Sequence, residues 1–156
     1  QRKENSMTGT ESLPKPMIHL QRLLPASPQE VFDAWIDPES LRQWFCPGTV
    51  SLTSVELDAR VGGHFRIVMQ DETKDLIHTG TYREINPPRR LVFTWRSSGT
   101  YAQETLVTVE LHARGAMTEL ELTHTLFPDD ATASNHERGW QSIVEKLAHH
   151  LTEHRP

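Results

Sequence analysis

The fold of this chain is decided by its last long segment, residues 134–153, which read SNHERGWQSIVEKLAHHLTE. Its apolar side chains recur at i, i+3, i+4, i+7, i+8 and i+11, the spacing of one helix face: Trp140, Ile143, Val144, Leu147, Ala148 and Leu151. The pattern predicts a helix from Ser134 to about Glu153, with Ser134 and Glu137 as a capping box. Such a helix is about 30 Å long and needs another surface to cover its apolar face.

Most of the chain before this helix has the two-residue periodicity of β-strands. A first strand is expected at 17–24, and six more candidates follow between Val50 and Phe127. The apolar positions change parity between Leu52 and Val55, which predicts a bulge near that point. The last candidate is the clearest half-buried strand, since Leu120, Leu122, His124 and Leu126 alternate with polar residues.

Two short helices are expected between the first and second strands. Ser27-Pro28-Gln29-Glu30 combines an N-cap serine, a proline at the first helical position and a glutamate that completes a capping box. Asp37-Pro38 then begins a second helix. The order of strand, two helices, six strands and helix predicts an α+β fold, a curved antiparallel sheet of about seven strands around a long C-terminal helix.

Composition and net charge limit the classes of binding partner and the cellular locations that we expect. The 156 residues suit one domain, which we expect at 17–153, after a polar and flexible segment at 1–16. A net charge of −5 argues against nucleic acid as a partner, and no apolar stretch predicts membrane insertion. Cys46 is the single cysteine and can form no internal disulfide, so a cytoplasmic location is expected. A homodimer stays open as an alternative.

Several short motifs in a fixed order point to a known family. They are Val31-Phe32-Asp33-Ala34-Trp35 with Asp37-Pro38, Trp44-Phe45, Gly62-Gly63-His64-Phe65, Gly80-Thr81-Tyr82, Pro87 to Trp95, Thr118 to His124, and Gly139-Trp140. In this order they resemble the START-like, or SRPBCC, helix-grip superfamily. Within it the chain resembles the AHSA-like homologues of the activator of the heat-shock chaperone ATPase. Cys46 stands where these proteins commonly carry glycine after the aromatic pair.

The resemblance implies a cavity between the sheet and the C-terminal helix. Members of the superfamily include lipid and hormone binders, aromatase/cyclases of polyketide synthesis and co-chaperone domains, and the AHSA-like name suggests a stress response. Fold therefore leaves function open.

Signals for catalysis and for metals are few. No glycine-rich phosphate loop or nucleophile elbow is present, and none of the nine histidines has the spacing of metal ligands. We therefore expect no cofactor, no metal and no catalytic residues. Tyr82 and Glu104 could act as acid and base only if both pointed inward.

The residues predicted to line a ligand cavity are the inward aromatic and apolar side chains, with one histidine: Trp44, Phe45, Phe65, Ile67, Met69, Phe93, Trp95, Leu122, His124, Trp140 and Ile143. His124 is the one titratable side chain on its strand face. It is either a core histidine with protein partners or a polar anchor for a ligand.

The leading functional prediction is non-enzymatic binding of a small hydrophobic or amphipathic molecule. One alternative is a cyclase- or hydrolase-like enzyme that uses His124, Tyr82 or Glu104 on an aromatic or polyketide substrate. A second alternative is a chaperone-associated interaction module. Two titratable side chains within hydrogen-bond reach in the cavity would favour chemistry, and a single inward polar group would favour binding.

Overall fold

The computed structural model describes residues 16–153, so the segment predicted to be flexible, 1–16, lies outside the described residues except for Pro16. The elements in chain order are β1 (Ile18–Leu24), α1 (Pro28–Ile36), α2 (Pro38–Trp44), β2 (Ser51–Leu57), β3 (His64–Asp71), β4 (Lys74–Asn86), β5 (Arg90–Trp95), the 3-10 turn η2 (Ser98–Thr100), β6 (Thr105–Arg114), β7 (Met117–Thr125) and α3 (Asp130–Glu153).

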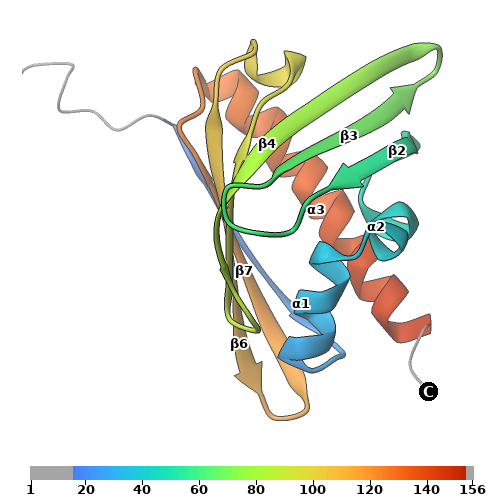
Figure 1. Ribbon diagram of the computed structural model, residues 1–156, viewed down its shortest axis with the longest axis vertical. Coiled ribbons are helices and arrows are strands. Elements are labelled where there is room, and N and C mark those ends of the chain that lie inside the picture. Colours follow the sequence, from blue (N-terminus) through green and yellow to red (C-terminus); the bar gives the residue numbers. More distant parts are fainter. Residues whose placement is uncertain (1–15, 154–156) are drawn as a thin grey trace, which may run out of the picture.

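All seven strands form one antiparallel sheet in the order β1-β7-β6-β5-β4-β3-β2. Only the first strand departs from a simple meander, because β1 lies beside the last strand, β7. Figure 1 shows α3 running diagonally across the sheet, with α1 and α2 beside its C-terminal half. This is the helix-grip α+β fold that the sequence predicts, with its two short helices after the first strand.

The predicted caps of the two short helices are confirmed. The Ser27 hydroxyl accepts from the Glu30 amide at 3.2 Å, and the Glu30 carboxylate accepts from the Ser27 amide at 3.0 Å. Asp37 accepts from the Glu39 amide at 3.2 Å and begins α2. The predicted bulge in β2 is also present, as a register shift between Leu52 and Ser54.

The start of α3 differs from the prediction. The helix begins at Asp130 rather than at Ser134. The Asp129 carboxylate accepts from the backbone amide of Thr132 at 2.8 Å and from its hydroxyl at 2.6 Å. Asp129 thus satisfies the first free amides of the helix, one turn earlier than the predicted capping box.

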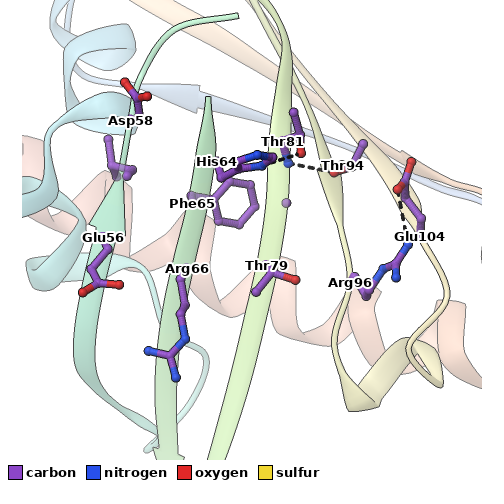
Figure 2. Close-up of a pocket in the computed structure, with 12 residues that line it drawn as sticks. Glu56, Asp58, His64, Phe65, Arg66, Thr79, Thr81, Thr94, Arg96 and Glu104 are labelled. Atoms are coloured by element: carbon purple, nitrogen blue, oxygen red, sulfur yellow. Dashed lines mark hydrogen bonds and ion pairs between the residues drawn. The ribbon is translucent and has the colours of Figure 1, made fainter. Parts of the chain in front are cut away.

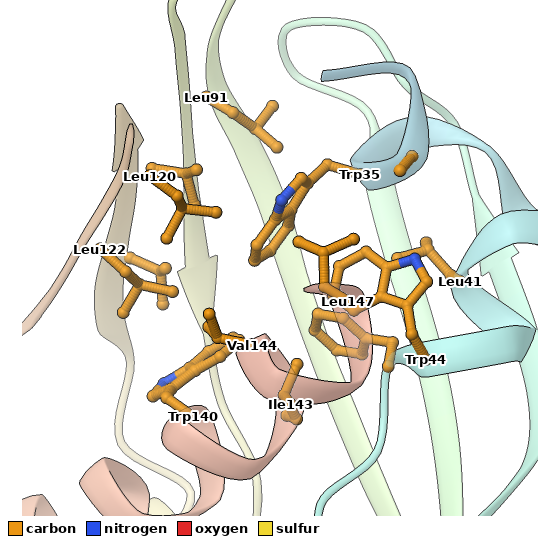
Figure 3. Packing of buried hydrophobic residues seen from close by; sticks show 14 of the residues in the cluster. Trp35, Leu41, Trp44, Leu91, Leu120, Leu122, Trp140, Ile143, Val144 and Leu147 are labelled. Atoms are coloured by element: carbon orange, nitrogen blue, oxygen red, sulfur yellow. The ribbon is translucent and has the colours of Figure 1, made fainter. Parts of the chain in front are cut away.

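The core lies between the sheet and the apolar stripe of α3. Figure 3 shows Trp140, Val144 and Leu147 of α3 facing Leu120 and Leu122 of the sheet. Trp35 of α1 and Trp44 of α2 complete this layer beside Leu147, and both indoles are buried. The N-terminal half of α3 lies over the sheet, where Trp140 reaches His124 of β7 and shares a pocket with residues of β3, β4, β5 and η2.

Candidate functional site

A chain of hydrogen bonds joins α3 to three strands of the sheet. The Trp140 indole donates to Nδ1 of His124 at 2.9 Å. Nε2 of His124 lies 2.7 Å from the Thr105 hydroxyl, which itself donates to the carbonyl oxygen of Trp95 at 2.6 Å. This relay holds Trp140 at a fixed position above β5, β6 and β7.

The relay determines the tautomer of His124. An indole N–H can only donate, so Nδ1 of His124 must be the acceptor and Nε2 must carry the proton. Nε2–H then donates to the Thr105 hydroxyl. Burial, with a smaller effect from the charge of His136, lowers the pKa of His124 well below its ordinary value. The imidazole is therefore neutral at neutral pH, as the relay requires.

A pocket of about 220 Å³ lies next to the relay, between the sheet and the N-terminal half of α3. Its lining comes from β3, β4, β5, η2, α3 and the loop after α2: Pro47, Met69, Leu76, His78, Trp95, Ser97, Ser98, Gly99, Asn135, His136, Gly139, Trp140 and Ile143. None of these residues is Lys, Arg, Asp or Glu. We call this space the α3 pocket.

The outer rim of the α3 pocket is tied to the helix. The ammonium of Lys146 donates to the carbonyl oxygens of Cys46 at 2.8 Å and of Gly48 at 2.6 Å. The Gly48 amide in turn donates to the Ser142 hydroxyl at 2.8 Å. These bonds fix the loop that carries Pro47. Cys46 is half-buried in this loop, and its Sγ atom lies 3.8 Å from the Lys146 nitrogen.

Two histidines of the pocket wall are held in the neutral form. Burial lowers the pKa of His78 from 6.5 to about 4, and the charge of His136 adds to this effect. Burial also lowers the pKa of His136, although its Nδ1 donates to the Thr132 carbonyl oxygen at 2.9 Å. The pocket therefore offers polar atoms without net charge at neutral pH.

Four of the predicted cavity residues line the α3 pocket: Met69, Trp95, Trp140 and Ile143. Four others, with Trp95 again, surround a separate apolar void of only about 20 Å³: Phe45, Phe65, Ile67 and Phe93. The remaining three, Trp44, Leu122 and His124, are fully buried in the packed core. Both ring nitrogens of His124 have protein partners, which corresponds to the core alternative for this residue.

Sequence reasoning missed His78 and His136. His78 shares the inward parity of Leu76 and Tyr82 on β4, so the alternation along that strand could have identified it. His136 is four residues before Trp140 and thus extends the apolar stripe of α3 by one turn. Placing the helix start at Ser134 concealed this, because it put His136 in the first turn.

The two residues weighed as an acid and base pair do not meet. Tyr82 lines the small apolar void, and burial raises its pKa to about 12. Glu104 lies on the outer side of the sheet, where it pairs with Arg83 at 3.0 Å and Arg96 at 3.3 Å.

A second, larger hollow of about 620 Å³ lies on the face of β2, β3, β4 and β5 that is turned away from α3. Figure 2 shows its polar floor, in which His64 meets Thr81 and the backbone of Thr81 meets the Thr94 hydroxyl. Exposed charged side chains of both signs surround this floor, among them Arg66 and Glu56. Its lining carries charged side chains, whereas the lining of the α3 pocket has none.

Comparison with known proteins agrees with this architecture. The family described as "Activator of Hsp90 ATPase homolog 1-like protein" (AHSA1) matches residues 25–152. The chain belongs to this family. The resemblance stated from the sequence motifs is thereby confirmed, and the family covers nearly the whole folded part of the chain.

Solved structures of bacterial AHSA1-type folds superpose well on this one. The AHSA1 protein of Silicibacter pomeroyi is 26% identical with a TM-score of 0.80, over 90% of this chain and 100% of that one. A protein of Chromobacterium violaceum is 28% identical with a TM-score of 0.80, over 86% and 96%. A protein of Nitrosomonas europaea, 24% identical with a TM-score of 0.75 over 88% and 94%, shares the fold. No curated protein matches the chain.

Two further properties concern the described part of this AHSA1 family member. Within residues 16–153 no helix has the length and apolar character to cross a membrane. In the same range no three side chains of His, Cys, Asp or Glu are grouped so that they could hold a metal ion.

Proposed function

We propose that this protein binds a small, mainly apolar molecule in the α3 pocket and performs no chemistry on it. The observation that carries the proposal is the pocket itself: a space of about 220 Å³ beneath the N-terminal half of α3, with two indoles in an uncharged lining. Indole rings offer large rigid contact surfaces for such a ligand.

The size of the pocket limits the ligand. Sites for drug-sized molecules are about 300–1,000 Å³, so a space of about 220 Å³ suits a molecule of one or two rings. Met69 and Ile143 would contact its apolar part, and Trp95 and Trp140 would contact its faces. The other predicted residues, Trp44, Phe45, Phe65, Ile67, Phe93, Leu122 and His124, would form the packed layer that keeps these walls in place.

Binding is favoured over proton transfer by the placement of the titratable groups. Of the three residues named for an enzymatic role, only His124 lies near the pocket, and its hydrogen bonds are already made within the protein. Among the described residues, His78 and His136 both line the pocket, yet no hydrogen bond joins them to each other. A general acid and base acting together need such reach or a shared substrate proton.

A substitution at Gly139 tests the proposal without weakening the fold. This glycine lies inside α3 at the pocket rim, and a Cβ there would meet only the Pro47 side chain, at 3.9 Å. Gly139→Leu should therefore fold well and place its side chain in the pocket. Gln141→Leu is the matched control, because it adds the same side chain on the exposed face of α3.

Equilibrium dialysis should show that wild type and Gln141→Leu bind 2-methylnaphthalene with micromolar dissociation constants. Such constants correspond to a binding free energy of about −8 kcal/mol. Gly139→Leu should bind it at least tenfold more weakly. Equal binding by Gly139→Leu would place the ligand elsewhere. Failure of the wild type to bind any apolar probe would leave the interaction-module alternative as the better account.

A cytoplasmic location remains part of the proposal, supported by the single cysteine, Cys46, which can form no internal disulfide. A role in the stress response and assembly into a homodimer remain predictions.

A further inference from the structure

Two buried polar atoms in the wall of the α3 pocket have no hydrogen-bond partner. They are Nε1 of Trp95 and Nδ1 of His78. The two side chains are 3% and 9% exposed, and their ring centroids are 4.8 Å apart. Both belong to the lining of the same pocket. A buried donor or acceptor without a partner costs free energy, so an adjacent pair calls for an explanation.

The Trp95 indole lines both the α3 pocket and the apolar void of about 20 Å³. Neither of the two unpartnered atoms touches solvent, so a ligand atom reaches them only when the rings part slightly. The small void that Trp95 also lines leaves space for only a slight shift of this ring.

The two atoms need different kinds of hydrogen-bond partner. The Trp95 indole can only donate, so it needs an acceptor. Burial lowers the pKa of His78 to about 4, against smaller opposing effects of the backbone at Ile67 and Leu76. In the neutral tautomer that carries its proton on Nε2, the lone pair on Nδ1 needs a donor. A hydroxyl group serves both, because its oxygen accepts while its proton is donated. A carbonyl or ether oxygen serves only the first.

We propose that the ligand of the α3 pocket is a neutral one- or two-ring aromatic molecule that carries a hydroxyl group, which accepts from Trp95 Nε1–H and donates to Nδ1 of His78. This inference rests on the proposed binding function. The lining contains no Lys or Arg to neutralise an anion and no Asp or Glu to neutralise a cation, so the ligand is uncharged.

Three probes of similar size test the proposal by equilibrium dialysis at neutral pH: 2-naphthol, 2-methylnaphthalene and 2-naphthoate. Wild type should bind 2-naphthol about tenfold more tightly than 2-methylnaphthalene, as expected for two added hydrogen bonds after desolvation. The anionic naphthoate should bind most weakly. Equal affinity for naphthol and methylnaphthalene, or preference for the naphthoate, would overturn the hydroxyl assignment while the binding function stands.

Substitutions test whether Trp95 and His78 produce the preference for 2-naphthol over 2-methylnaphthalene. Trp95→Phe and His78→Phe should each reduce the ratio of the two dissociation constants severalfold while still binding 2-methylnaphthalene. Trp35→Phe is the matched control, because the Trp35 indole is also buried and unpartnered but lines the small void instead of the pocket. It should keep the wild-type ratio.

A ratio unchanged in both pocket variants would overturn the proposal. The ratio of the 2-naphthol and 2-methylnaphthalene dissociation constants is measured within one protein, so differences in stability between variants do not enter it. The wild-type ratio alone also tests the proposal, so a variant that folds poorly does not remove the test. If neither naphthol nor methylnaphthalene binds the wild type, both the binding function and this inference fail.

Discussion

Trp140 performs two tasks at one position. Its ring packs against the rings of Trp35, Phe45 and Trp95, with centroids 5.6–6.2 Å apart. Its N–H donates to His124 and so joins the helix to the relay on the sheet. The same side chain therefore anchors α3 and forms one wall of the pocket, which ties the stability of the helix contact to the shape of the site.

This double role predicts a large effect of truncation. Trp140→Ala should lower the free energy of unfolding by about 3–5 kcal/mol, because it removes a buried indole, leaves a cavity and strips His124 of its donor. Chemical denaturation gives the value. Gln141→Ala, one position along on the exposed face, should be nearly silent. A Trp140→Ala variant as stable as wild type would contradict the helix-on-sheet packing.

The histidines show how far sequence reasoning reached at this scale. His124 stood out because it is the one polar residue on a long apolar face, and the structure places it in the core. His78 belongs to a strand whose inward positions are less regular, with a glycine at position 80 and half-buried neighbours. Which buried histidine keeps a free ring nitrogen depends on partners that are distant in sequence, and local pattern cannot supply them.

At the level of elements, α3 contains Gly139 in its interior, where no close contact requires a glycine. A Cβ at Gly139 would lie in ordinary contact with Pro47 alone. Glycine at such a position costs about 1 kcal/mol relative to alanine, because it has more backbone freedom to lose. Gly80 on β4 is different, because a Cβ there would collide with the Thr94 carbonyl oxygen and the Phe65 ring.

These two glycines should respond to alanine in opposite directions. Gly139→Ala should raise the free energy of unfolding by about 0.5–1 kcal/mol. Gly80→Ala should lower it by more than 1 kcal/mol, since backbone and ring must both move. Thermal and denaturant unfolding measure both. Destabilisation by Gly139→Ala would mean that the rim near Pro47 is tighter than the structure indicates.

Elements were predictable where their signals are local. The capping box at Ser27, the cap at Asp37 and the bulge in β2 each rest on a few adjacent residues, and each is present. The start of α3 was misplaced because two caps compete, and Asp129 with Thr132 makes the earlier one. The pocket itself was only an expectation from the family, since its volume depends on how six segments meet.

At the scale of the whole molecule, two buried histidines, His78 and His124, and the half-buried His136 make the fold sensitive to acid. The pKa of His78, of His124 and of His136 is lowered, in each case mainly by burial. An unfolded chain takes up a proton on each ring near 6.5, whereas folded His78 does so only near 4. Between these values the unfolded state binds more protons, so unfolding becomes easier as pH falls.

The stabilisation from these neutral rings should therefore be complete above pH 6.5 and should be lost progressively as pH falls toward 4. His78 alone contributes about 3 kcal/mol to this loss. Denaturant unfolding at a series of pH values should show a flatter curve for His78→Phe. His149→Gln, on the exposed face of α3, should follow the wild-type curve. A wild-type stability constant from pH 7 to 4.5 would contradict neutral burial.

The central claim is that a small molecule binds beneath α3 rather than in the hollow on the outer face of the sheet. Nuclear magnetic resonance of the labelled protein, titrated with 2-methylnaphthalene, tests it most directly. We predict that the indole N–H signals of Trp95 and Trp140 and the amide of Gly139 move together and saturate, while the amides of Arg66 and Thr81 stay unchanged. Saturating shifts at Arg66 and Thr81, with the two indoles and Gly139 unaffected, would contradict the account.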